Sequence, residues 1–263
     1  MPSLKLHRDA NFGEVSNMST GGEIAGKPPT SSTGTQYAIN YLRLGVPADS
    51  THKPAQRGGA RNFASNGTDS LSIAHVGKLI AATEYTVAIG LPFNRMITIH
   101  WESAGILPAG IVKATGRFID LFTKTLSRHG HCNALIWVQE NGHRKGAHVH
   151  ILAHVPASAV KLIDRMKYKW LRSITGIAYK KRVIKSDPIG GRLNIENSNR
   201  ALHLANLETA LGYVLKGASA EAAAKFKLSR LEPGGNCIGK RCGMSQNIGP
   251  KARKRTKTEG HQI

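Results

Sequence analysis

The sequence predicts an α+β fold in which helices cover one face of an antiparallel sheet. Segments with the two-residue period of strands alternate with segments that have the period of about 3.6 residues of helices. Two of the strand segments are separated by only a short polar loop, which indicates a β-hairpin in the middle of the domain. With the helices on one face, we expect the opposite face of the sheet to stay open.

The same periodicities place the individual elements. In the segment that begins at Pro108, for example, Ile111, Phe118 and Phe122 lie on one helical face, and the proline suits a helix start. Helices are expected at 70–84, 108–127, 157–175 and 199–215, with a short Ala-rich helix after residue 219. Strands are expected at 94–101, 133–140 and 146–156, with weaker β character at 177–179, 183–184 and 192–195.

The composition along the chain suggests one folded domain with two tails. Residues 1–70 are rich in Gly, Ser, Thr, Asn and Pro and are expected to be a disordered or loosely ordered arm. Residues 71–235 carry the periodic segments, and residues 236–263 are expected to be a disordered basic C-terminal tail. Three cysteines, an odd number, favour reduced thiols, and no apolar signal segment is present. These features predict a cytoplasmic protein.

The charge is strongly positive: 37 Lys and Arg residues against 16 Asp and Glu give +21. Such a chain attracts polyanions, and nucleic acid is the partner we expect. No long basic amphipathic stretch with aromatic anchors or run of about 18 apolar residues suggests a membrane. The candidate DNA-binding residues are Lys167, Lys169 and Arg172 on the helix 157–175, and Lys240, Arg241, Lys251, Arg253, Lys254 and Arg255 in the tail.

The strand 146–156 presents histidines on one face and an apolar face on the other. His148 and His150 share a face because strand side chains alternate. If the hairpin pairs symmetrically about its loop, Glu140 lies opposite His148, whereas a slip of one residue substitutes Gln139. Two imidazoles and a carboxylate form a facial ligand set for a divalent metal. His154 fits an ordinary surface or network histidine better, and all these histidines can also be solvated residues.

Tyr213 and Lys216 are three residues apart on the helix 199–215, so they share a face. Without further evidence, this pair indicates a core aromatic residue and a solvated charge near a helix end. Beside a metal site and a basic surface, they are the components of phosphoryl transfer by covalent catalysis.

The segment His148-Val149-His150, with Glu140 upstream and Tyr213-Val214-Leu215-Lys216 downstream, resembles the HUH endonucleases. In particular it is similar to the single-tyrosine rolling-circle replication initiators, over about residues 92–217. The resemblance implies a ferredoxin- or RRM-like core and a divalent ion, Mn or Mg first, held by His148, His150 and Glu140. It also implies that Tyr213 is the nucleophile and that Lys216 lies near the phosphate or the tyrosine oxygen.

The function implied by this resemblance is site-specific nicking of single-stranded or hairpin DNA, with a 5′-phosphotyrosine and a free 3′-OH as products. The nick would start rolling-circle replication of a plasmid or phage-like element. A host helicase and polymerase would complete the process, since the chain has no Gly-x-x-x-x-Gly-Lys-Ser/Thr loop. A single-tyrosine transposase and a non-catalytic basic nucleic-acid-binding protein are the alternatives.

Overall fold

The computed structural model describes residues 67–143 and 145–259 of the chain. They belong to one compact unit, Thr33–Ile263. The other unit, Met1–Ser32, and the rest of the expected N-terminal arm up to residue 66 lie outside the described residues.

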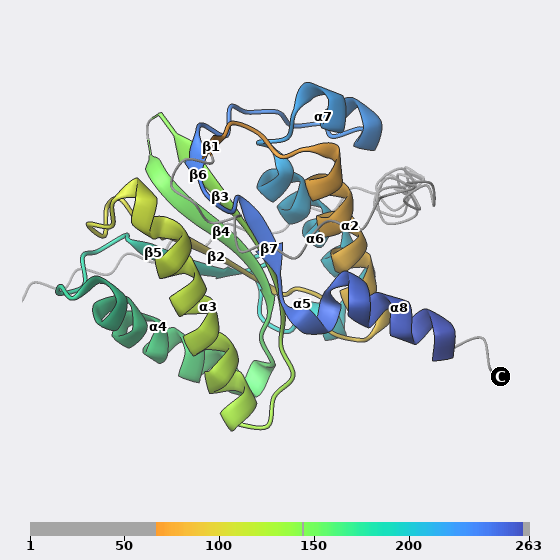
Figure 1. Ribbon diagram of the computed structural model, residues 1–263. Coiled ribbons are helices and arrows are strands. Elements are labelled where there is room, and N and C mark those ends of the chain that lie inside the picture. Colours follow the sequence, from red (N-terminus) through yellow and green to blue (C-terminus); the bar gives the residue numbers. More distant parts are fainter. Residues whose placement is uncertain (1–66, 144, 260–263) are drawn as a thin grey trace, which may run out of the picture. The chain divides into compact units, whose positions relative to one another are not determined.

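The described chain has an α+β fold built on a five-stranded antiparallel sheet with the strand order β5-β2-β4-β3-β7 (Figure 1). A separate pair joins β1 to β6. The strands are β1 (Gly67–Thr68), β2 (Arg95–His100), β3 (Ala134–Gly142), β4 (Gly146–His154), β5 (Ile184–Pro188), β6 (Cys237–Ile238) and β7 (Cys242–Met244). The helices are α2 (Ile73–Ala88), α3 (Ile111–Arg128), α4 (Val160–Thr175), α5 (Ile195–Ser198), α6 (Arg200–Leu215), α7 (Ala220–Phe226) and α8 (Pro250–Glu259), with 3-10 helices at Pro108–Gly110, Ala157–Ala159 and Gln246–Ile248.

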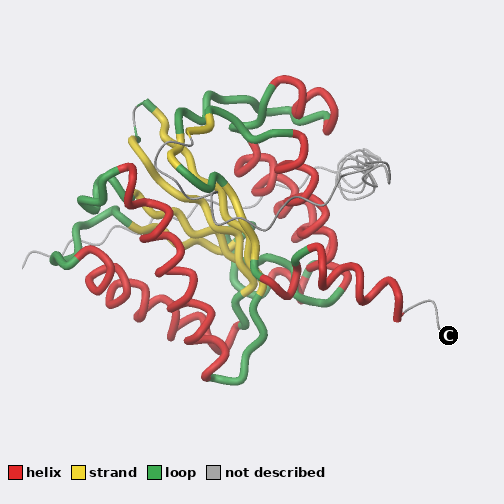
Figure 2. Tube along the Cα trace, in the orientation of Figure 1, coloured by secondary structure: helices red, strands yellow, loops and turns green. Residues whose placement is uncertain are grey.

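Helices cover both faces of the sheet, so the expectation of one open face is wrong (Figures 1 and 2). On one face, α3 and α4 pack against the odd-numbered side chains of the central strands, such as Ile97 and Ile151. On the other, α2 and α6 pack against even-numbered ones, such as Ile136 and Leu152. The reason is that α2 and α6 also carry apolar stripes, and each stripe must be removed from water. The stripe residues buried there include Val76, Leu79, Ile80, Leu207, Leu211 and Val214.

The segment between α4 and α6 contains one strand rather than several. β5 pairs with the edge of β2, from Ile99↔Ile184 to Arg95↔Pro188. The predicted β segment at 192–195 is wrong, because Gly190 and Gly191 have φ values of 85° and 75° and turn the chain into α5. The weaker β character at 177–179 likewise forms no strand.

The expected disordered C-terminal tail is folded over residues 237–259, which is a second correction. β7 pairs with β3, with Val138 opposite Cys242 and Ile136 opposite Met244. Trp137 lies against Gly243, where a Cβ would come within 2.7 Å of the indole nitrogen. The tail folds because the open edge of β3 gains hydrogen bonds from β7 and because only glycine fits beneath the indole.

Several residues expected on a DNA-binding surface are engaged in the fold. Arg241 is 2% exposed, and its Nη1 donates to the carbonyl oxygens of Thr68 and Gly235. Lys167 is buried, with its Nζ 2.8 Å from Asp164 Oδ1. Arg253 is half-buried and donates from Nη1 to the Ile248 carbonyl at 2.7 Å. For Lys167 and Arg241 the expected surface role is therefore wrong. The candidate residues that are exposed are Lys169, Arg172, Lys240, Lys251, Lys254 and Arg255.

None of the helices in the described ranges is long and apolar enough to cross a bilayer. The thiols of Cys132, Cys237 and Cys242 are free.

Replacing Arg241 with Ala should lower the free energy of unfolding by about 2–3 kcal/mol, because two half-buried carbonyls lose the buried, charged donor that pairs with them. Lys240→Ala is the matched control, because Lys240 is exposed. Its Nζ lies over the Trp137 ring, 5.5 Å from the centroid. That contact is worth about 1 kcal/mol or less at an exposed site. Urea unfolding measures both variants, and equal losses would contradict the buried role of Arg241.

Candidate metal centre

The central hairpin aligns the predicted ligands in the predicted register. Glu140 is the cross-strand partner of His148, and Val138 is the partner of His150. Gln139 pairs with Val149 and points to the opposite face, so Glu140 is the residue that joins the two histidines. The face they share is the one covered by α2 and α6.

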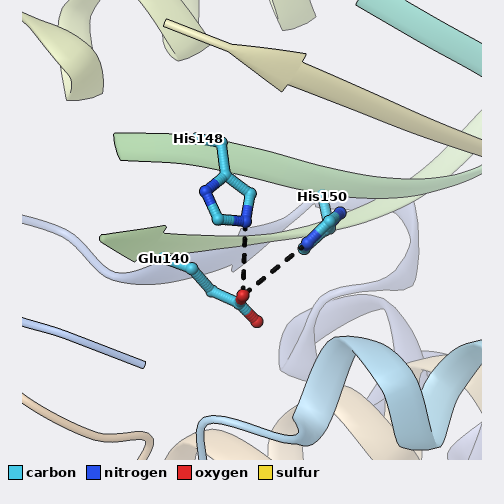
Figure 3. A group of neighbouring side chains, drawn as sticks. All are labelled: Glu140, His148 and His150. Atoms are coloured by element: carbon cyan, nitrogen blue, oxygen red, sulfur yellow. Dashed lines mark ion pairs between the residues drawn. The ribbon is translucent and has the colours of Figure 1, made fainter. Parts of the chain in front are cut away.

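The three side chains converge on one point (Figure 3). His148 Nε2 lies 3.3 Å from Glu140 Oε2, and His150 Nε2 lies 3.7 Å from the same oxygen. One nitrogen or oxygen atom from each residue lies within 4.8 Å of the others, and the three residues are 2–3% exposed. Such a cluster could hold a metal ion.

Hydrogen bonds on the far side of His148 fix which of its nitrogens faces the cluster. His148 Nδ1 lies 2.8 Å from the Gly146 carbonyl oxygen. A carbonyl only accepts, so Nδ1 carries a proton and, in the neutral ring, Nε2 presents a lone pair. That lone pair faces the oxygen lone pairs of Glu140. Two acceptors at this distance repel each other unless a cation, either a proton or a metal ion, lies between them.

His150 is oriented by a neighbour on β2. Its Nδ1 lies 2.9 Å from Thr98 Oγ1, and Thr98 is its cross-strand partner. His150 Nε2 and Glu140 Oε1 are buried and have no hydrogen-bond partner among the described residues. Buried polar atoms are rarely left unpaired. Two imidazole nitrogens and a carboxylate oxygen therefore fit a divalent ion of the Mn to Zn series, and a mixed site of this kind can also accept Mg.

The ionisation states suit cation binding. Burial alone would raise the pKa of Glu140, but its interactions with His148, His150 and Lys216 outweigh burial and hold that pKa well below the usual range. Burial lowers the pKa of His150, although the Glu140 charge opposes the change. At neutral pH the carboxylate is charged and the His150 imidazole is neutral, which is the form of each that binds metal.

Helix α6 brings Tyr213 and Lys216 to the cluster. Lys216 Nζ donates to Glu140 Oε2 in an ion pair that is buried on both sides. The Tyr213 ring packs edge-on against His150, with the ring centroids 5.1 Å apart. Lys216 Nζ lies 5.0 Å from the Tyr213 ring centroid. Burial raises the pKa of the Tyr213 phenol, and the Glu140 charge raises it further, so a nearby cation is needed to favour the phenolate.

His154 stands outside the cluster. Its Nδ1 lies 2.9 Å from the Pro92 carbonyl oxygen, at the other end of β4. The expectation that Glu140, not His154, joins His148 and His150 is therefore confirmed for the geometry of the cluster.

Sequence reasoning missed four residues around the cluster: Thr98, His100, Arg230 and Glu232. Thr98 and His100 share the histidine face, and the His100 ring lies 5.3 Å from the His148 ring. The pattern of residues 95–100 placed them on one face, but only the pairing of β2 with β4 puts them beside the histidines. Arg230 and Glu232 lie in a loop after α7, and no sequence signal distinguishes them from other charged loop residues.

Comparison with known proteins adds no relative: no family model, no curated protein and no solved structure matches the chain.

Replacing His150 with Ala should weaken Mn²⁺ binding by at least about 100-fold, because a ligand contributes more than a supporting residue. His154→Ala is the matched control on the same strand and should bind as the wild type does. Isothermal titration calorimetry measures the Mn²⁺ affinity of both variants, and circular dichroism verifies that they are folded. Equal affinity of the two variants would rule out His150 as a ligand.

Thr98→Val should lower the metal affinity by about 10- to 100-fold, since valine cannot form the hydrogen bond that orients His150. Thr98→Ser keeps the hydroxyl and should retain most of the affinity. The same titration compares the two, and a Ser variant as weak as the Val variant would show that the hydroxyl is not what matters.

Proposed function

We propose that the protein is a metal-dependent endonuclease that nicks single-stranded DNA at a specific site and transfers the strand through a 5′-phosphotyrosine at Tyr213. The observation that carries this proposal is the contact between Tyr213 and His150. A nucleophile candidate and a candidate metal centre, distant in the sequence, meet on one face of the sheet. The excess of positive charge supports a polyanionic substrate.

The side chains would divide the chemistry as follows. A divalent ion held by Glu140, His148 and His150 would polarise the scissile phosphate. Tyr213 Oη forms a bond to phosphorus as the bond to the 3′ oxygen breaks, and the phenolic proton passes through solvent to that leaving oxygen, which becomes the 3′-OH. Lys216 is fixed by Glu140 near the ring of Tyr213, where its charge would favour the phenolate or orient the phosphate.

The topology supports the same family of enzymes. The elements β2, α3, β3, β4, α4 and β5 follow the βαββαβ order, with the spatial order β5-β2-β4-β3. This is the order of a ferredoxin-like split βαβ unit, the core that the HUH resemblance implies. In this proposal α2, α6 and β7 are additions to that core, and α6 carries the nucleophile.

Initiation of rolling-circle replication is the biological role we propose, with a host helicase and polymerase acting on the free 3′-OH. A single-tyrosine transposase would use the same side chains and the same covalent step. The DNA that becomes joined, a replication origin or the ends of a mobile element, distinguishes the two. A purely non-catalytic binding role is disfavoured by His150 Nε2 and Glu140 Oε1, which are buried and have no hydrogen-bond partner in the described part of the chain.

Tyr213→Phe should abolish the covalent adduct between the protein and labelled, hairpin-forming single-stranded DNA in the presence of Mn²⁺ or Mg²⁺. Tyr179→Phe, whose ring packs against Tyr168 and the core beside α3 and α4, is the control and should form wild-type amounts. Denaturing gel electrophoresis detects the adduct, and circular dichroism verifies the fold. An adduct that persists in the Tyr213 variant would remove the proposed nucleophile.

A further inference from the structure

We propose that Arg230 binds a backbone phosphate of the DNA next to Tyr213, and that Glu232 holds this phosphate site in the free protein. The identity of the ligand rests on the proposed function, since a single-stranded polynucleotide is the substrate class assumed. Neither residue belongs to the motifs that first indicated the site.

The loop that carries both residues is anchored at the candidate active site. After α7 the chain returns to the end of α6, where the Glu232 amide donates to the Lys216 carbonyl at 2.8 Å. Two residues later, the Gly234 carbonyl accepts from the Asn141 amide at 2.8 Å, next to Glu140 on β3. The loop is thus tied both to the helix that carries Tyr213 and to the strand that carries Glu140.

Arg230 lies over the tyrosine. Its guanidinium carbon is 5.0 Å from the Tyr213 ring centroid, the same distance as Lys216 Nζ. The two cations differ in accessibility: the Lys216 side chain is 5% exposed and engaged with Glu140, whereas the Arg230 side chain is 52% exposed. Arg230 is therefore the cation of the two that an incoming phosphate can reach.

Glu232 holds the position that we assign to the phosphate. One of its oxygens, Oε1, accepts from Arg230 Nε at 2.8 Å and from Arg230 Nη2. The other, Oε2, lies 3.7 Å from Lys216 Nζ. The two cations hold this carboxylate beside the candidate nucleophile. An anion of another kind, such as a phosphate, can therefore bind in its place. Arginine binds carboxylate and phosphate with the same paired donors, so a phosphate can replace Glu232 at the guanidinium.

This exchange predicts effects of opposite sign at the two residues. Without Arg230 the site loses a phosphate contact, so DNA binds more weakly. Without the charge of Glu232 the guanidinium is no longer neutralised, so DNA binds more tightly. A purely structural role for the Arg230–Glu232 pair predicts instead that both substitutions weaken binding together, by loosening the loop.

The test is fluorescence anisotropy with a labelled single-stranded oligonucleotide, in EDTA and in the Tyr213→Phe background, so that neither metal nor cleavage contributes. Arg230→Ala should weaken binding by roughly tenfold and reduce the salt slope by about 0.7, the value for one phosphate on a single strand. Glu232→Gln should strengthen binding several-fold. Arg128→Ala is the matched control, an exposed arginine on α3 on the opposite face of the sheet, and should change affinity less than about twofold.

Each outcome decides a separate point. If Arg230→Ala binds as the control does, or if Glu232→Gln weakens binding as Arg230→Ala does, the inference is overturned. Circular dichroism and thermal unfolding of each variant exclude loss of folding as the cause. Failure of the proposed function is distinguishable, because it appears as an adduct that survives Tyr213→Phe, whereas these binding measurements do not depend on cleavage.

Discussion

The buried carboxylate of Glu140 is the group on which the arrangement of this protein depends. Burying a charge costs several kcal/mol unless partners compensate it. Here the partners come from two elements. Lys216 at the end of α6 and the pair His148 and His150 on β4 face the carboxylate on β3. Removing one partner of a buried pair typically costs about 3–5 kcal/mol, so the sheet and α6 are held in one relative position.

This constraint explains why α6 covers the histidine face and yet leaves Tyr213 partly exposed beside it. α6 packs apolar residues such as Leu211 and Val214 against the sheet, and its last turn brings Tyr213 beside His150. Tyr213 itself stays half-buried, with an exposed arginine over its ring. The layer that closes the core therefore also delivers the side chain that we propose as the nucleophile.

The sequence predicted what depends on short-range patterns. The hairpin register followed from a short loop and a two-residue period, and so did the meeting of Glu140 with His148. The second covering layer was missed, because an apolar stripe such as that of α2 does not say which face of a sheet it covers. β7 was missed because three residues in a basic segment have no strand signal, and only the open edge of β3 makes them a strand.

Charged residues were the hardest to place from sequence. Lys240 and Arg241 are adjacent in the sequence and both positively charged, yet Arg241 is buried and Lys240 is exposed. The difference arises from two carbonyls that accept from Arg241: that of Gly235, nearby in the sequence, and that of Thr68, at the other end of the described chain. For the same reason Arg230 and Glu232 could not be told apart from other loop charges, because their significance lies in the end of α6 that they reach.

The position of β7 in the chain also bears on the order in which the protein takes shape during synthesis. Glu140 and its two histidines emerge from the ribosome well before Lys216, and β7 follows only at residues 242–244. Until Lys216 emerges the carboxylate lacks its lysine, and until β7 emerges β3 has an unpaired edge, a surface that other strands can join. β7 thus both completes the sheet and ends the interval in which the edge of β3 is exposed to misassembly.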